Sequence, residues 1–256
     1  MDAKISVRDL WKTYPTRQGP LSVLAGIEFT VADGEFVALV GPSGCGKTTL
    51  LHILAGFERP DRGEVTIDAR LVTGPSPKGI VISQQGSVFP WLTVQQNLMF
   101  GLNGLPKPER RRLVDHYVAM VGLQGFERAF PFQLSGGMRQ RVEVARALIV
   151  KPDLLYMDEP LAALDALMRL RMRLELLRIL ATERHTTLLV THDVEEAIHL
   201  ADRILILSPR PTRIQSIKQV PFPHPRKLSS PEVGELKEEI LRELGVESDI
   251  VLDVVQ

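Results

Sequence analysis

The sequence is poor in the features that mark secreted and membrane-spanning proteins. Its single cysteine, Cys45, cannot form a disulfide within the chain, which favours a reducing compartment. No apolar run approaches the roughly 18 residues that a membrane-spanning helix needs, and residues 1–6 lack the apolar core of a signal peptide. We therefore expect neither a membrane span nor a secretory leader.

The chain also lacks an excess of charge of either sign. Lys plus Arg and Asp plus Glu both total 31, so the net charge is zero, which argues against a general nucleic-acid binder. Residues 109–112 form the most basic short run. Because Pro108 can begin a helix with an apolar face, we interpret these arginines as its solvated side. With 256 residues, 44% of them hydrophobic, the chain can bury one large core or two unequal ones.

A phosphate-binding loop is predicted between a strand and a helix. Residues 35–40 read as a buried strand, and residues 47–55 as a helix closed by Gly56. The segment between them fits G-x-x-x-x-G-K-[ST], in which backbone N–H groups surround phosphate oxygens, the lysine reaches the β and γ phosphates, and the hydroxyl binds Mg²⁺. An ordinary glycine-rich turn does not explain this position at a helix amino end. The predicted residues are Gly41, Pro42, Ser43, Gly44, Cys45, Gly46, Lys47, Thr48 and Thr49, with Thr48 as the metal ligand.

Two further apolar runs end in polar residues. Residues 154–157 are followed by Asp158 and Glu159, and residues 186–191 are followed by His192. If both runs are parallel strands, their carboxyl ends open onto the same crevice as the phosphate loop. Asp158 is then a ligand of Mg²⁺ and Glu159 polarises the attacking water, whereas His192 stabilises charge on the transferring group. The alternatives are a solvated acidic turn before Pro160 and a structural histidine.

Residues 134–138, Leu-Ser-Gly-Gly-Met, begin a helix that is predicted to end before Lys151. Its amino end, with Ser135, Gly136 and Gly137, is a second anion site. Two phosphate-binding helix ends in one chain require either two ligands or a partner chain that shares one.

With these motifs in their order and spacing, the chain resembles the ATP-binding cassette (ABC) family from about residue 4 to residue 215. The resemblance implies that the Ser135 motif caps the γ phosphate of ATP held by a second ATPase copy, in a head-to-tail dimer. It also implies that Tyr14 stacks on adenine, that Gln84 approaches Mg²⁺ and the attacking water, and that Asp165 lies in a loop that crosses between the subunits. Tyr14 could instead be a core aromatic. Ser83 and Ala162 depart from the residues usual in the family.

The family resemblance and the coarse pattern together predict the architecture. We expect an α/β fold with a P-loop NTPase core, a mainly parallel central sheet, an antiparallel β layer near residues 5–10, 27–31 and 64–67, and an inserted α-helical subdomain over about 85–154. The ATPase domain is predicted to span residues 1–220. A helix capped by Ser230 and Pro231 is predicted within a C-terminal extension, residues 221–256. Residues 165–182 read as a leucine-rich helix that is mostly core.

The resemblance implies an ATPase that powers solute transport through partner permeases from the cytoplasmic face of the inner membrane, as a peripheral subunit and without nucleic acid. Residues 89–94 (Phe-Pro-Trp-Leu-Thr-Val) and 97–101 resemble the importer branch for nitrate, sulfonates and taurine, which implies an extracytoplasmic solute-binding protein. Trp91 is predicted to anchor a permease helix, with a core position as the alternative. Lipid exporters and non-transport members, such as those of DNA repair and translation control, are the other candidates. A small-molecule kinase does not explain the Ser135 motif.

Overall fold

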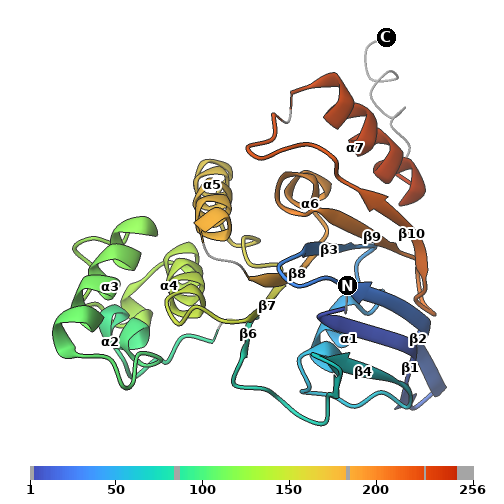
Figure 1. The fold of residues 1–256 in the computed structure, drawn as a ribbon, viewed down its shortest axis with the longest axis horizontal. Helices are drawn as coiled ribbons and strands as arrows, with labels where there is room; N and C mark the ends of the chain where they lie inside the picture. Colours follow the sequence, from blue (N-terminus) through green and yellow to red (C-terminus); the bar gives the residue numbers. More distant parts are fainter. Residues whose placement is uncertain (1–2, 84–86, 183–184, 228, 247–256) are drawn as a thin grey trace. The chain divides into compact units, whose positions relative to one another are not determined.

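The computed structural model describes residues 3–83, 87–182, 185–227 and 229–246. The chain forms two compact units (Figure 1), the first comprising Met1–Ser76 with Thr186–Gln256 and the second Pro77–His185. Within the described ranges, no helix is both long and apolar enough to cross a membrane. The predicted domain boundaries at residues 85, 154 and 220 stay predictions.

The first unit contains the predicted antiparallel layer, with longer strands than the sequence pattern indicated. The strand order is β2, β1, β4, β5. A register shift interrupts β1 between Val7 and Leu10, where Asp9 has a φ of 43°. Gly63 on β4 allows this bulge, because a Cβ at that position would lie 2.1 Å from the Asp9 carbonyl oxygen. The strands are β1 (Ile5–Thr16), β2 (Gly19–Val31), β4 (Arg62–Ile67) and β5 (Arg70–Leu71).

A mainly parallel set of strands forms the core of the first unit, in the order β10, β9, β3, β8. All residues of β3 and β8 are buried, as expected for strands covered on both faces. Val40 at the end of β3 pairs with Thr191 of β8 and with Ile206 of β9. The chain segments after these strands therefore leave from the same edge. The strands are β3 (Phe36–Val40), β8 (Thr186–Thr191), β9 (Arg203–Leu207) and β10 (Ile214–Gln219), of which only β10 is antiparallel to its neighbour.

Three helices cover these strands, namely α1 (Lys47–Leu54), α6 (Val194–Leu200) and α7 (Pro231–Glu243). Helix α6 packs against β3 and β8, and α7 packs against α6 (Figure 1). The predicted C-terminal helix is confirmed at both ends: Ser230 caps its first turn by accepting from the Val233 N–H, and Gly245 follows it with a φ of 74°.

The second unit is mostly helical around a two-stranded parallel pair. Ile82 of β6 pairs with Met157 of β7, so these strands also end at one edge. Helix α4 contacts α2, α3 and β6. The arginines at 111 and 112 are exposed, whereas Val114, Tyr117 and Val118 are buried, as predicted for a solvated face opposite an apolar one. The elements are β6 (Gly79–Ile82), α2 (Val94–Met99), α3 (Lys107–Met120), η1 (Pro131–Gln133), α4 (Gly136–Leu148), β7 (Leu154–Asp158) and α5 (Ala166–Thr182).

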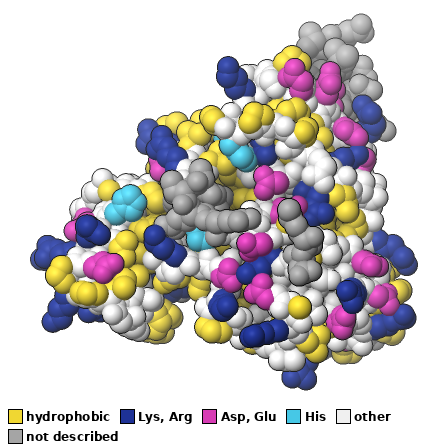
Figure 2. Space-filling model, in the orientation of Figure 1, with side chains coloured by type: hydrophobic (Ala, Val, Ile, Leu, Met, Phe, Trp, Pro, Cys, Tyr) yellow, Lys and Arg dark blue, Asp and Glu magenta, His cyan; other side chains and the backbone are white. Residues whose placement is uncertain are grey.

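Figure 2 shows acidic and basic side chains interspersed over one face of the molecule. The described salt bridges include pairs such as Arg203 with Glu35 at 2.8 Å and Lys218 with Glu243 at 2.5 Å. The zero net charge of the sequence thus corresponds to mixed charge on this face rather than to separate fields of one sign.

A buried arginine fastens the segment before α7 to the core of the first unit. Arg226 is 6% exposed, and its guanidinium donates to the carbonyl oxygens of Ile198, Ala201, Phe222 and Val220 at 2.6–3.3 Å. Ile198 and Ala201 belong to the carboxyl end of α6. The charge therefore compensates the negative end of a helix dipole while it closes the extension onto α6.

Arg226→Met should lower the free energy of unfolding by about 3 kcal/mol, because it leaves buried carbonyls without donors. Urea denaturation of the full chain measures this loss. Lys227→Met is the matched control, since Lys227 is exposed and adjacent. Equal stability of the two variants would contradict the anchoring role of Arg226.

Candidate functional site

The predicted phosphate loop connects β3 to α1 in the first unit. Gly46 is the N-cap of α1 with a φ of 118° and makes no side-chain cap, which is typical of a helix end that binds an anion. A Cβ on Gly46 would lie 2.6 Å from Val23 Cγ1, so a larger residue would displace the loop. Cys45 is buried, and the Thr212 hydroxyl donates to its carbonyl oxygen, which gives this cysteine a packing position.

Lys47 lies inside this loop. Its side chain is 6% exposed, and Nζ donates to the carbonyl oxygens of Gly41 at 2.8 Å and Pro42 at 2.9 Å. Burial of an ammonium is costly unless a negative charge compensates it. A phosphate bound in the loop would supply that charge, so the position of Lys47 fits the predicted ligand.

His192 leaves the same edge of the first unit as the phosphate loop, because Thr191 pairs with Val40. Its side chain is exposed. The turn that carries it is fixed: the Thr191 hydroxyl accepts from the Asp193 N–H at 3.0 Å and donates to Glu196 at 2.5 Å. Asp193 in turn caps α6. The structure thus brings the predicted histidine to the edge where the loop begins.

Tyr14 lies on β1, half-buried. Its hydroxyl donates to Glu58 Oε1 at 2.6 Å, and Lys12 Nζ lies 5.3 Å from the ring centroid. Burial raises the pKa of the phenol, the Glu58 hydrogen bond raises it further, and a hydrogen bond with Thr49 of α1 lowers it. The half-buried ring differs from a fully buried core position, and the base-stacking role stays a prediction.

In the second unit, Asp158 ends β7 and is 4% exposed. Glu159 follows in the left-handed region with a φ of 49°. This conformation costs a non-glycine residue about 1 kcal/mol or more, and such strain is typical of functional positions. It turns the chain sharply directly after the strand.

Gln140, which had no predicted role, stabilises this turn. Its Nε2 donates to the Glu159 carbonyl oxygen at 3.3 Å, and its Oε1 accepts from the Ala163 N–H at 3.1 Å. Because Gln140 belongs to α4, it links the helix of the Ser135 motif to the segment that carries Glu159. Only the tertiary contact identifies it, since a polar residue on a helix next to two arginines reads from sequence as solvated.

The Ser135 motif forms the amino end of α4, as predicted. Ser135 is the N-cap, and its Oγ accepts from the Met138 N–H at 3.2 Å. Ser135 and Gly136 are exposed, so an anion can approach this end of the helix from solvent. Asp165 is exposed too, and its Oδ1 caps α5 by accepting from the Met168 N–H at 3.0 Å.

Gln84 lies outside the described residues, but the segments on both sides of it share one partner. Glu143 of α4 is 3% exposed and accepts from the Ser83 N–H at 3.3 Å and from the Ser87 hydroxyl at 2.7 Å. Arg146 donates to the same Ser87 hydroxyl at 2.5 Å. No sequence pattern indicates this buried carboxylate, which accepts from the N–H of Ser83, a residue that departs from those usual in the family.

The structure therefore groups the predicted residues in two sets. Tyr14, Lys47 with its loop, and His192 belong to the first unit. Asp158, Glu159, the Ser135 motif and Asp165 belong to the second unit. Thr48 and Asp158 offer oxygen donors, which are the ligands that Mg²⁺ prefers, so the donor chemistry fits the predicted metal.

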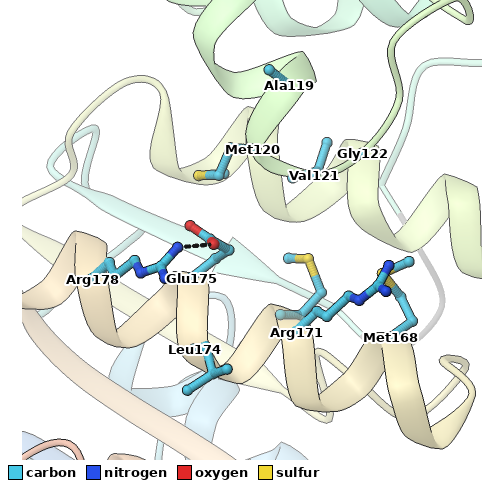
Figure 3. Close-up of a pocket in the computed structure, with 10 residues that line it drawn as sticks. Ala119, Met120, Val121, Gly122, Met168, Arg171, Leu174, Glu175 and Arg178 are labelled. Carbon is cyan, nitrogen blue, oxygen red and sulfur yellow. Dashed lines mark hydrogen bonds and ion pairs between the residues drawn. The ribbon is translucent and has the colours of Figure 1, made fainter.

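A cavity of about 370 Å³ in the second unit is separate from these residues (Figure 3). It lies between the carboxyl end of α3 and α5, and Arg178 pairs with Glu175 at its side at 2.5 Å. Its lining includes none of the predicted phosphate, metal or base residues, so we assign it no part in nucleotide chemistry. The lining residues are Ala119, Met120, Val121, Gly122, Met168, Arg171, Met172, Leu174, Glu175 and Arg178.

Comparisons with known sequences identify relatives over most of the chain. Residues 24–162 match the profile of the family described as ABC transporter. A putative ATP-binding protein of Brucella abortus is 46% identical, over 88% of this chain and 86% of that protein. The aliphatic sulfonates import ATP-binding protein of Bacillus cereus is 40% identical, over 93% and 95%. The bicarbonate transport ATP-binding protein of Synechocystis sp. is 39% identical, over 88% and 81%.

A solved bacterial ABC transporter cassette, described as dimeric, has a TM-score of 0.77 and 28% identity, over 85% of this chain and 99% of that one. A second structure is a dimeric post-hydrolysis state of that cassette bound to ADP and Pi, with a TM-score of 0.76 and 29% identity. The predicted fold class, a P-loop core with parallel strands, an antiparallel layer and helices, is confirmed by this likeness.

Glu143→Gln tests the buried carboxylate. Burial raises the pKa of Glu143 above 4.5, and this outweighs the opposing effects of Ser87 and Arg146. The folded chain then retains a proton that the unfolded chain has released, so this group's contribution to stability falls as the pH rises from 4.5 through the raised pKa. The variant lacks that loss. Its free energy of unfolding, relative to the wild type, should therefore rise over this window in urea denaturation.

Glu127→Gln provides a control of opposite sign. Backbone hydrogen bonds, including that from the Gly125 N–H at 3.0 Å, lower the pKa of Glu127 below 4.5. Its stabilising effect is lost as the pH falls through the lowered pKa, so this variant should lose stability relative to the wild type as the pH rises towards 4.5. A pH-independent difference for Glu143→Gln would contradict the burial of its charge.

Proposed function

Because this chain belongs to the ABC transporter family and is one of its ATPases, we propose that it powers the import of a small solute through partner membrane permeases. ATP is its substrate, and hydrolysis to ADP and phosphate is its reaction. The proposed role is that of a peripheral subunit at the cytoplasmic face of the cell membrane, where closing and reopening of an ATPase dimer moves the permeases.

This proposal is carried by the amino ends of two helices: that of α1 has no side-chain cap, and that of α4 is exposed. The first N–H groups of α1 lack a side-chain cap, and the amino end of α4, at Ser135 and Gly136, is open to solvent. One bound ATP can satisfy both kinds of end if they come from different copies. In a head-to-tail dimer, the Ser135 motif of one copy covers the γ phosphate held by the other copy. Such a dimer has two ATP sites, each formed by the amino end of α1 from one copy and the amino end of α4 from the other.

Binding follows from the residues of the first unit. The Tyr14 ring stacks on the base, while the N–H groups after Gly41 surround the phosphates. Lys47 exchanges its two backbone acceptors at Gly41 and Pro42 for phosphate oxygens. Each new contact is charge-assisted and therefore stronger than the carbonyl bond that it replaces.

The metal in this proposal is Mg²⁺, held by the Thr48 hydroxyl and the carboxylate of Asp158, with Gln84 completing the protein donors. When bound, the ion neutralises charge on the β and γ phosphates. Asp158 is nine-tenths buried or more at the end of β7, so its carboxylate is oriented before the nucleotide arrives.

Hydrolysis is then a displacement at the γ phosphorus. A water oxygen forms the new P–O bond, the bond to the bridging oxygen of ADP breaks, and the water proton passes to the Glu159 carboxylate. His192 donates a hydrogen bond to the transferring group, where negative charge develops. Gln140 acts as a positioning residue, because it holds the carbonyl oxygen of the strained Glu159.

Two observations favour an importer. Relatives that are 40% and 39% identical over most of both chains are named for sulfonate import and bicarbonate transport. The segment that carries Phe89 and Trp91 also has the pattern of that branch. We propose a small solute such as a sulfonate, nitrate or taurine, delivered by an extracytoplasmic binding protein. Neighbouring genes for that protein and a permease would support this choice.

The proposed permease contact is the loop before α2. Trp91 is 69% exposed, so it is not a core residue, and its ring lies 5.4 Å from that of Phe89. Asn97 is fully buried, and its amide donates to the carbonyl oxygens of Phe89, Leu92 and Thr93 at 3.0–3.2 Å. The loop is therefore rigid, and an exposed aromatic on a rigid loop is a frequent centre of binding energy.

Glu159→Gln tests the shared site. The amide keeps the shape of the carboxylate but cannot accept the proton. The variant should therefore still bind ATP, but hydrolyse it at least about a hundredfold more slowly than the wild type. Dimers should accumulate with ATP and Mg²⁺, as measured by light scattering. Addition of Ser135→Arg should abolish them, because the long cationic side chain blocks the amino end of α4. If the Glu159→Gln variant did not dimerise with ATP and Mg²⁺, either alone or in the complex with its permeases, the head-to-tail dimer would be contradicted.

Trp91→Ala tests the permease contact in the complex reconstituted with its permeases. Solute uptake should fall at least about tenfold while the ATPase rate of the isolated subunit stays within about twofold, because Trp91 is not among the residues predicted to hold the nucleotide or the metal. Phe57→Ala is the control, since Phe57 is an exposed aromatic of the first unit, 58% accessible. Equal uptake by both variants would contradict the contact.

A further inference from the structure

An exposed aromatic ring lies directly before the amino end of α4. Phe132 is the middle residue of the turn η1, and its side chain is 75% exposed, more than that of Trp91. A single exposed apolar side chain is common on protein surfaces and by itself assigns nothing. The residues around Phe132 indicate more specifically that the ring is a contact for another protein surface.

The turn that carries Phe132 is rigid. The Phe130 N–H donates to Gln133 Oε1 at 2.8 Å, and the Gln133 N–H donates back to the Phe130 carbonyl oxygen at 2.9 Å. Pro131 and Leu134, on either side of the exposed ring, are buried. The Phe130 ring stacks on that of Phe132 at 5.7 Å with an interplanar angle of 10°. The ring is thus held in solvent by a fixed backbone and a stacked neighbour, which limits the entropy that a partner must remove.

The position of Phe132 in the chain indicates which surface the ring contacts. Ser135, three residues further on, caps α4 and is exposed, as is Gly136. In the proposed function this helix end meets the γ phosphate held by a second copy. Phe132 belongs to the turn that leads directly into α4, with Leu134 buried between them, so the ring and the helix end approach the second copy together.

We infer that Phe132 is an apolar contact of the ATP-bound dimer and packs on the second copy of this chain, beside the phosphate loop which that copy presents. The inference rests on the proposed function. The contact occurs twice in a two-fold symmetric dimer, so each dimer buries two rings. The polar motif recognises phosphate, and the ring adds binding energy that depends on the surface around it.

The test uses the full chain with Glu159→Gln, so that ATP is retained. Addition of Phe132→Ala should weaken the dimer formed with ATP and Mg²⁺ by about tenfold or more, measured by sedimentation equilibrium. Binding of a fluorescent ATP analogue by the dilute monomer should stay within about twofold, since the ring serves the other copy's site. Phe132→Tyr should restore the dimer, because it preserves the ring.

Phe126→Ala is the matched control. Phe126 is 43% exposed and precedes η1 in the same unit, but it is outside the turn. Its loss should leave the dimer within about twofold, as expected of surface contacts outside an energetic centre. Thermal unfolding of Phe132→Ala should match that of the parent, because the ring is exposed in the monomer.

The outcomes separate the two proposals. If Glu159→Gln does not dimerise with ATP, also in the complex with its permeases, the proposed function fails before Phe132 is tested. If it dimerises and Phe132→Ala dimerises equally well, the inference is wrong and the proposed function remains. Equal weakening by Phe126→Ala, or a loss of thermal stability in Phe132→Ala, would also overturn the inference.

Discussion

The uncapped amino end of α1 is the constraint on which the rest of the molecule depends. Gly46 offers no side-chain acceptor to the first turn of α1, and this helix end suits a ligand that brings its own negative charge. Lys47 is buried beside them, with backbone carbonyls as its described acceptors. A phosphate bound in the loop compensates the buried ammonium and is favoured by the amino end of the helix. The free protein is in this sense pre-organised for ATP.

In the second unit, helix α4 connects several of the predicted site residues. Helix α4 carries the Ser135 motif at its amino end, followed along the helix by Gln140 and then Glu143. Gln140 contacts the backbone at Glu159 and Ala163, and Glu143 contacts the segments on both sides of Gln84. In the proposed function, α4 therefore links the amino end that meets the second copy to the proposed base and to the segments that flank Gln84. This is a physical basis for coupling dimer closure to hydrolysis.

Much of the fold could be predicted from the sequence. Short apolar runs predicted β3, β7 and β8, and glycine and proline signals predicted the bounds of α1 and α7, because local chemistry decides these features. Strand β1 was predicted to end near residue 10 but continues to Thr16. The bulge at Asp9 breaks the alternation on which that prediction depended.

The tertiary contacts of polar residues could not be predicted. Glu143 reads as an ordinary helix-surface residue, yet it is nearly fully buried. The leucine-rich α5 was predicted to be mostly core, and Met172 and Leu176 are indeed buried, but Leu167, Leu170 and Leu174 are exposed. Periodicity shows that a helix has an apolar side, but it does not show how much of that side another element covers.

The central claim is that each ATP site combines residues of two copies. It is tested most directly by mixing two inactive variants, Lys47→Ala and Ser135→Arg. In a head-to-tail dimer, one site of each mixed pair combines both lesions and the other combines the intact loop of one chain with the intact Ser135 motif of the other. About a quarter of the wild-type turnover per site should therefore return on mixing. A mixture no more active than its separate components would contradict the shared site.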